Sequence, residues 1–145
     1  MEIERKFLVK KLPEHLETYP CLLIEQAYLC TDPVVRVRRQ NDDYYMTYKG
    51  RGLMEREEYN LPLNAAAYEH LKAKPDGRTI TKKRCCIPLG ELTIELDIFS
   101  SPEGLVLAEV EFPTREAALS FTPPEWFGED VTGDSRYHNS NMIGR

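Results

Sequence analysis

The sequence is poor in the residues that form thiolate or imidazole metal sites. Its 145 residues include four cysteines and three histidines. No cysteines follow the C-x-x-C spacing, and the adjacent Cys85 and Cys86 would point to opposite faces of a strand. A zinc site is therefore not predicted, and we interpret the cysteines as reduced thiols of a cytoplasmic protein. His15, His70 and His138 fall in a predicted loop, a predicted helix and the tail, and we interpret them as surface groups.

Long apolar runs are also missing. No segment is apolar enough to cross a bilayer, and neither end carries the pattern of a signal peptide, so we expect no membrane association. The formal net charge of −5 is unlike the basic excess of nucleic-acid-binding proteins, so we expect no nucleic-acid partner. A length of 145 residues with 41% hydrophobic residues predicts one domain over residues 1–145 with its own core.

Short strand-like runs separated by turn signals are what the sequence has in abundance. The short connections favour antiparallel hairpins, and two segments favour helices: residues 64–74, and a helix that begins at Thr114 as its N-cap. A further short helix is predicted near residues 124–127. Together these elements predict an α+β fold, an eight-stranded antiparallel closed β-barrel (a tunnel) with flanking helices. The predicted strands are residues 2–9, 22–29, 34–40, 44–49, 53–61, 79–87, 92–99 and 105–112.

The first predicted strand, MEIERKFLV, places three charges on one face. Glu2, Glu4 and Lys6 are two residues apart, so their side chains project to the same side at intervals of about 7 Å. The other strands repeat this pattern, and charged faces are ordinarily the solvated side of an antiparallel sheet. Here the charges are sorted by strand, acidic in the first, seventh and eighth and basic in the third, fourth and sixth. Because soluble surfaces intersperse their signs, we predict that these faces line the barrel interior.

Sorted charges inside a barrel need sorted counterions. Two like charges about 4 Å apart repel by roughly 4 kcal/mol at an effective dielectric constant near 20. Clustered arginines favour a polyanion, because guanidinium groups bind phosphate oxygens in pairs. Clustered carboxylates favour a hard divalent cation such as Mg²⁺ or Mn²⁺. A metal-bound polyphosphate would satisfy both clusters, so the residues predict a small-molecule triphosphate ligand.

The motifs on these strands resemble those of one known family. EIERK matches the ExExK signature of the CYTH superfamily, the triphosphate tunnel metalloenzymes, and the sequence is similar to the small bacterial members along nearly its whole length. One departure is Asn60, where many members have a carboxylate, so only Glu58 is carried over from that strand. The supporting motifs follow in order: RVRR, TYKG, REEYN, KKR, ELD, AEVEF and VTGDSRYHN.

The resemblance implies a metal-dependent triphosphatase that hydrolyses the terminal phosphoanhydride of inorganic tripolyphosphate, with Mg²⁺ or Mn²⁺ as cofactor. It makes a catalytic pair of Lys6 and Tyr28 plausible as a tuner of substrate choice, the alternative being a tyrosine that only packs at a strand end. It also suggests a homodimer. The residues implied to bind phosphate are Lys6, Arg36, Arg38, Lys49, Arg56, Lys82 and Arg84. The residues implied to bind metal, directly or through water, are Glu2, Glu4, Glu58, Glu95, Asp97, Glu109 and Glu111.

Other functions stay open at the level of sequence. Members of this family also hydrolyse thiamine triphosphate or nucleoside triphosphates, and others are class IV-type adenylyl cyclases. A non-catalytic polyphosphate-binding module is a further alternative, which would keep the basic set but lose the carboxylates that this sequence retains. Arg136 is a secondary site candidate, since it could reach the tunnel. The alternative is that it pairs with Asp134 at the surface.

Overall fold

A computed structural model describes residues 1–74 and 79–142 of the chain. The helices are α1 (Ala65–Lys72) and α2 (Arg115–Ser120), with single 3₁₀ turns η1 (Leu16–Thr18), η2 (Ser135–Tyr137) and η3 (Asn139–Asn141). The strands are β1 (Glu2–Val9), β2 (Cys21–Thr31), β3 (Val34–Gln40), β4 (Asp43–Lys49), β5 (Glu55–Arg56), β6 (Glu58–Pro62), β7 (Ile80–Leu89), β8 (Leu92–Ser101), β9 (Glu103–Glu111) and β10 (Phe127–Asp130).

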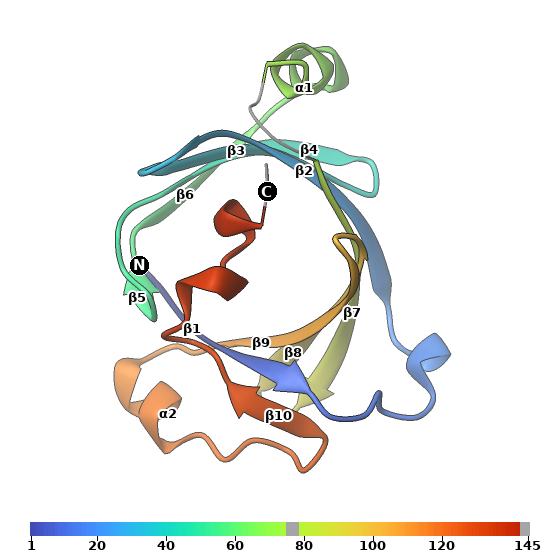
Figure 1. The fold of residues 1–145 in the computed structure, drawn as a ribbon, viewed down its shortest axis with the longest axis vertical. Helices are drawn as coiled ribbons and strands as arrows, with labels where there is room; N and C mark the ends of the chain where they lie inside the picture. The colour runs from blue at the N-terminus through green and yellow to red at the C-terminus, as the bar shows by residue number, and fades with distance from the viewer. Residues whose placement is uncertain (75–78, 143–145) are drawn as a thin grey trace.

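The strands form a nearly closed antiparallel barrel, which appears as a ring in Figure 1. Their order is β10-β1-β9-β8-β7-β2-β3-β4-β6, and the short β5 pairs back to β1 with Glu2 opposite Arg56. The predicted barrel is therefore confirmed. The strand count differs for two reasons: the run predicted over residues 53–61 is divided into β5 and β6, and β10 adds a strand to the other edge of β1.

Both longer helices lie outside the barrel (Figure 1). Each begins at a side-chain cap as expected, because Asn64 Oδ1 accepts from the Ala67 amide at 2.7 Å and Thr114 Oγ1 accepts from the Ala117 amide at 3.1 Å. The helix predicted near residues 124–127 is wrong. That segment is a turn that leads into β10, since its last residue, Phe127, pairs with Val9 of β1 as a strand residue.

The apolar faces of the strands pack outward against these coverings. On one side, Leu96 and Val110 belong to a buried cluster that includes Ala118 of α2 and Phe127 of β10. On another side, Tyr68 of α1 is buried against Ala27 and Val37. This outer packing leaves the opposite faces of the same strands to line the interior.

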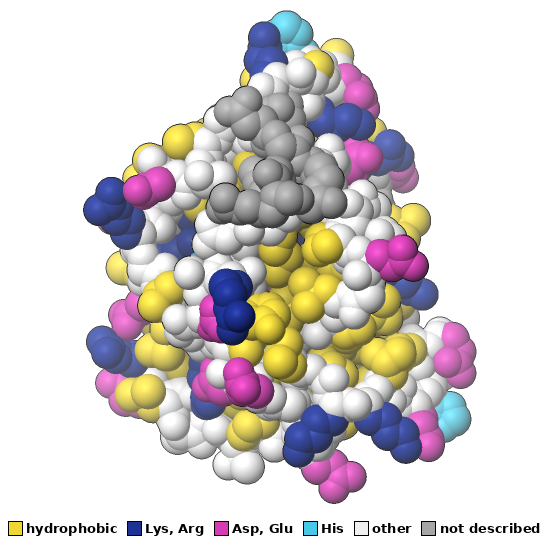
Figure 2. Space-filling view, in the orientation of Figure 1, with side chains coloured by type: hydrophobic (Ala, Val, Ile, Leu, Met, Phe, Trp, Pro, Cys, Tyr) yellow, Lys and Arg dark blue, Asp and Glu magenta, His cyan; other side chains and the backbone are white. Residues whose placement is uncertain are grey.

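The interior has a charged half and an apolar half. Strand β8 carries Glu95 and Asp97 on the same face as Phe99, so the face changes from charged to apolar along the strand. The segment after β10 enters the ring in Figure 1 and completes the apolar half. Figure 2 shows hydrophobic side chains gathered at the centre of the molecule in the same view. The apolar cluster comprises Tyr28, Val34, Ile80, Phe99, Leu107 and Val131, with Leu8, Leu105, Tyr137 and Met142 against it. The predicted charged faces therefore line one part of the interior, and apolar side chains line the rest.

Among the described residues, no helix is both long and apolar enough to pass through a lipid bilayer.

Candidate active site

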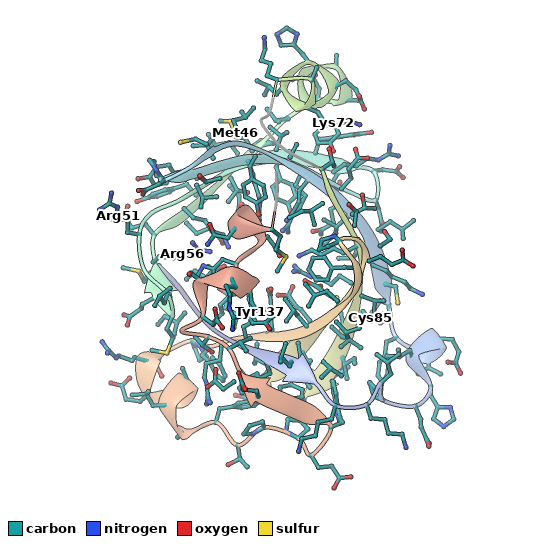
Figure 3. All side chains as sticks on the ribbon, viewed as in Figure 1. Met46, Arg51, Arg56, Lys72, Cys85 and Tyr137 are labelled. Carbon is teal, nitrogen blue, oxygen red and sulfur yellow. The ribbon has the colours of Figure 1, made fainter. Side chains whose placement is uncertain are left out.

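The charged half of the barrel encloses a cavity of about 180 Å³. Most of the residues predicted for the site meet on its wall: Glu2, Glu4, Lys6, Tyr28, Arg36, Arg38, Lys49, Arg56, Glu58, Arg84, Glu95, Glu109 and Glu111. The period-two alternation explains this convergence, because every second residue of a barrel strand faces inward. Figure 3 shows Arg56 pointing into the ring, whereas Met46 and Arg51 lie on the outside.

Arg36 and Arg38 of β3 form the basic wall. Each is only 5% exposed, and neither forms an ion pair with a carboxylate in the described part of the chain. The Nε atom of Arg36 is buried and has no hydrogen-bond partner among the described residues. Burial and then the charges of Arg36 and Arg84 lower the pKa of Arg38. Two buried, unneutralised guanidinium groups on one strand face are suited to an anion with several oxygens.

Glu4, Glu95 and Glu111 form the acidic wall on the adjacent strands β1, β8 and β9. Glu4 lies directly opposite Glu111, a pairing of like charges that destabilises a sheet. Burial, with the nearby charges of Glu109 and Glu2, raises the pKa of Glu4 to about 7. Burial and neighbouring carboxylates also raise the pKa of Glu111. Within residues 1–74 and 79–142, Glu95 forms an ion pair with one cation, Arg84, at 3.1 Å.

Between the two walls, charges neutralise one another. Lys49 Nζ lies 3.1 Å from Oε2 of Glu2 and 3.3 Å from Oε2 of Glu58, and Arg56 lies 3.6 Å from Glu2. Burial, which outweighs the attraction of Lys49, raises the pKa of Glu2. In Glu58 burial is outweighed by the hydrogen bond from Glu2 and by Lys49, so its pKa is lowered. This group fixes the side of the cavity where β1, β4 and β6 meet.

Arg84 is held by three carboxylates. Its Nε donates to Asp97 at 2.7 Å, its Nη1 to Glu95 at 3.1 Å, and its Nη2 lies 3.5 Å from Glu109. Lys82 contacts Asp97 at 2.8 Å, and both side chains are fully buried. Lys82 and Asp97 do not line the cavity, so the structure places these two predicted ligands beneath Arg84 rather than at the wall.

Lys6 and Tyr28 both reach the cavity but are engaged by different partners. Lys6 Nζ donates to the Tyr137 carbonyl at 3.0 Å and lies 3.4 Å from Glu109. The charges of Glu109 and Glu4 outweigh burial and raise the pKa of Lys6. The phenol oxygen of Tyr28 accepts from Gln26 Nε2 at 3.2 Å, and no hydrogen bond between described atoms joins Lys6 to Tyr28. The C-terminal segment therefore enters the site through the carbonyl of Tyr137 (Figure 3).

Several wall residues were not predicted as site residues. Tyr45 and Asn60 share strand faces with predicted residues, so the alternation contained the signal for them. Gln40 shares a strand face with Arg36 and Arg38, so the alternation contained the signal for it as well, whereas Asn139 belongs to a turn without periodicity and had no comparable signal. Val34 marks the border with the apolar half of the interior.

Two predictions concern the C-terminal tail: the one for His138 is wrong, and the structure decides between the two alternatives for Arg136. His138 was interpreted as a surface group, but it is only 7% exposed, because the tail folds back onto the barrel. Burial, followed by the charges of Lys6 and Arg56, lowers the pKa of His138 to about 4. Arg136 pairs with Asp134 at 2.7 Å, its side chain is 78% exposed, and it does not line the cavity.

The carboxylates at the cavity wall are of the chemical type that binds a divalent cation, but the described side chains are not arranged as a complete metal site. Within residues 1–74 and 79–142, no three His, Cys, Asp or Glu side chains stand close enough together to hold an ion as they are placed. The acidic wall nevertheless consists of carboxylate oxygens, the ligands that hard divalent cations prefer. Burial first, and then neighbouring carboxylates, raise the pKa values of Glu4 and Glu111, so a cation at this wall would favour their ionised forms.

A nearly closed barrel with basic and acidic walls facing one cavity defines the class of charged-tunnel proteins. Comparison with known families gives the same result: residues 1–119 match the CYTH domain, and the chain belongs to this family. Two similar curated proteins are both named inorganic triphosphatase. The one from Nitrosomonas europaea is 43% identical, covering 97% of this chain and 95% of its own length. The one from Acetivibrio thermocellus is 40% identical, covering 98% of this chain and 92% of its own length.

Solved structures agree with this assignment. The crystal structure of the inorganic triphosphatase NE1496 matches with a TM-score of 0.72 and 37% identity, covering 98% of this chain and 93% of that one. A conserved protein from Pyrococcus furiosus matches with a TM-score of 0.64 at 22% identity, covering 82% of this chain and 84% of that one. The second likeness concerns the fold alone.

Proposed function

We propose that this protein is a divalent-metal-dependent triphosphatase that hydrolyses the terminal phosphoanhydride of inorganic tripolyphosphate. The observation that carries the proposal is the pairing of unneutralised buried arginines, Arg36 and Arg38, with a facing set of carboxylates in one cavity. The names of the two similar curated proteins support the same substrate. The cavity wall offers polar and charged groups almost throughout, which suits a phosphate chain better than a base or a thiazole ring.

In this proposal the basic groups bind and orient the substrate. Arg36 and Arg38 each offer guanidinium nitrogens to phosphate oxygens, and their charges stabilise the negative charge that shifts toward the leaving group in the transition state. Lys6 and Tyr28 reach the same cavity as further donors. Lys49, Arg56 and Arg84 are already paired with carboxylates, so their charges are partly neutralised. In this proposal they help to position the phosphate chain of the substrate.

The acidic wall is proposed to hold the cofactor, Mg²⁺ or Mn²⁺. Glu4, Glu95 and Glu111 are the carboxylates best placed to serve, because they have the fewest cationic partners among the described residues. When bound, such an ion offsets charge on phosphate oxygens and lowers the pKa of a bound water. Glu2, Glu58 and Glu109 already contact lysine or arginine, and in this proposal they act as outer partners of the site.

The two ends of the interior are proposed to differ in access. At the apolar end, the C-terminal segment fills the ring with Val131 and Tyr137 and excludes water there. At the charged end, Glu95 and Glu111 also border an outer hollow lined by Glu91, Thr93 and residues of the α2 region. We infer that the cation enters from this acidic mouth.

The test is a product assay on tripolyphosphate, thiamine triphosphate and ATP with Mg²⁺, Mn²⁺ or EDTA. We expect metal-dependent release of one orthophosphate and one pyrophosphate per tripolyphosphate, faster than hydrolysis of the other two compounds. Faster hydrolysis of thiamine triphosphate or ATP would make that compound the substrate in place of tripolyphosphate. Formation of pyrophosphate and cyclic AMP from ATP would make the protein a cyclase. Tight tripolyphosphate binding without turnover would make it a binding module.

Three further properties stay predictions: a single domain over residues 1–145, a cytoplasmic location and a homodimer. Size-exclusion chromatography with light scattering tests the last directly, with a mass of twice 16.8 kDa as the expected result. A mass of one chain would contradict it.

A further inference from the structure

Gln26 of β2 is a fully buried amide between two groups of the site. It lies opposite Arg38 in the β2–β3 pairing and faces the barrel interior two residues before Tyr28. Its Oε1 accepts from Arg38 Nε at 2.8 Å, and its Nε2 donates to the phenol oxygen of Tyr28 at 3.2 Å. Gln26 thus joins a phosphate-binding candidate to a catalytic candidate without touching the cavity wall itself.

The chemistry of the neighbours fixes which way the amide points. The guanidinium of Arg38 can only donate hydrogen bonds, so the amide atom that faces it must be the oxygen. The NH₂ group must then face Tyr28. Because an NH₂ group only donates, Tyr28 must accept with its phenol oxygen, and its own proton has to point elsewhere. In the hydrogen bonds of the described residues, Tyr28 takes part only as this acceptor, and its side chain lines the cavity.

The same amide orders Arg38. With Nε engaged by Gln26, the guanidinium plane is held while its terminal nitrogens remain on the cavity side, where Nη1 makes only a long contact of 3.4 Å to Tyr45. A planar fork whose inner nitrogen is fixed keeps its outer edge free for paired contacts with phosphate oxygens.

We propose that Gln26 is a positioning residue that sets the direction of the Tyr28 hydroxyl, so that this group donates its proton toward an oxygen of the bound phosphate chain. The inference rests on the proposed triphosphatase function. It makes Tyr28 a donor of fixed direction, and it assigns the function of Gln26 to orientation rather than to contact with substrate.

Gln26→Glu reverses this direction with almost no change in shape. A carboxylate at this position still accepts from Arg38, but it offers Tyr28 an acceptor in place of a donor, so the phenol proton turns away from the cavity. We expect turnover of tripolyphosphate to fall by about tenfold to a hundredfold, the range for losing one hydrogen bond to a charged group, and to match Tyr28→Phe. In the Tyr28→Phe background, Gln26→Glu should cause little further loss, because residues that act as one unit are not additive.

Gln26→Met separates orientation from structure. It removes both hydrogen bonds but leaves the Tyr28 hydroxyl free to donate to substrate, so we expect a smaller loss of turnover than in Gln26→Glu, together with a lower melting temperature. A purely structural role predicts the reverse order, since Gln26→Glu keeps every buried group partnered. Gln40→Glu is the charge control: it adds a carboxylate to the same interior face as Arg38, two residues along β3, through a residue bonded to Tyr45 rather than Tyr28.

The outcomes separate the two proposals. If the wild-type protein does not hydrolyse tripolyphosphate, the proposed function fails before any variant is compared. If the wild-type protein is active and Gln26→Glu retains full turnover, the positioning role is overturned. It is also overturned if Gln26→Glu loses as much activity in the Tyr28→Phe background as in the wild type, because the loss would then come from neutralising Arg38. Circular dichroism on each variant establishes that the folded protein is being assayed.

Discussion

Lys82 Nζ lies 2.8 Å from Oδ2 of Asp97, and both side chains are completely buried inside the barrel. Asp97 also accepts from Arg84 at 2.7 and 2.9 Å, so one carboxylate contacts both cations. Burial lowers the pKa of Lys82 to about 7 despite this partner, whereas Arg84 and Lys82 outweigh burial and lower the pKa of Asp97. The buried pair of Lys82 and Asp97 therefore supports the part of the cavity wall that Arg84 forms.

The first prediction follows from this unequal sharing. Asp97→Asn leaves Lys82 and Arg84 with less negative charge, so we expect a loss of about 3–5 kcal/mol in the free energy of unfolding. Lys82→Met leaves Asp97 with its two hydrogen bonds from Arg84, so we expect a smaller loss. Urea unfolding of both variants measures the difference. A larger loss for Lys82→Met would show that Asp97 is not the shared centre.

The second prediction concerns the repulsion between the unpaired side chains of Arg36 and Arg38. Arg36 and Arg38 are about 7 Å apart along one strand face, where their repulsion is about 2 kcal/mol at an effective dielectric constant near 20. Arg36→Met should therefore leave the free protein at least as stable as the wild type, while it weakens tripolyphosphate binding by tenfold or more. Calorimetric titration and thermal melting give the two readouts.

Arg39→Met is the matched control for that experiment. Arg39 is on the same strand but faces outward, where its Nη2 lies 4.0 Å from Oδ1 of Asp42. The substitution Arg39→Met removes the same charge without changing the cavity, so tripolyphosphate affinity should change by less than threefold. Equal effects of the two variants would mean that overall charge, rather than the basic wall, governs binding.

The third prediction concerns metal binding and pH. Because the pKa of Glu4 is raised to about 7, this carboxylate is mostly protonated at pH 6 and mostly ionised at pH 8. A cation competes with that proton, so we expect the apparent affinity for Mn²⁺ to rise about tenfold from pH 6 to pH 8. Glu4→Gln should abolish the rise, whereas Glu57→Gln, at an exposed position, should keep it. Titration calorimetry at the two pH values measures this, and a pH-independent affinity in the wild type would contradict it.

The fourth prediction concerns stability in acid. The pKa of His138 is lowered from 6.5 to about 4, so the unfolded chain binds a proton at a higher pH than the folded protein does. This contribution to stability is full above pH 6.5 and is lost as the pH falls toward 4. It amounts to about 2 kcal/mol between pH 7 and pH 5. The stability of His138→Gln should therefore fall less than that of the wild type over this range in urea unfolding. Parallel curves for the two proteins would contradict the assignment.

The sequence predicted the walls of the site because strand alternation is a local property. Once Glu4 and Arg36 are assigned to strands, parity decides which way they face, and the sorting of charge decides that this side is inside. Parity also puts Ile80 and Leu107 inside, where they belong to the apolar half of the interior rather than to the charged walls.

The C-terminal part was predicted least well because its structure depends on distant contacts. Phe127 becomes a strand residue only because the free edge of β1 is available to it, and His138 is buried only because the tail turns back into the ring. No local period encodes either contact. Gln26 was missed as a site residue for a related reason, since its role depends on Arg38 of a neighbouring strand.

The most direct test of the proposed reaction is orthophosphate release from tripolyphosphate by the wild type and by Glu4→Gln and Arg36→Met, each with Mg²⁺, Mn²⁺ or EDTA. We expect turnover by the wild type only with metal. We expect a loss of at least a hundredfold in Glu4→Gln that extra metal partly restores, and a loss in Arg36→Met that extra metal does not restore. Turnover in EDTA, or full activity in either variant, would contradict a reaction that depends on the two walls together.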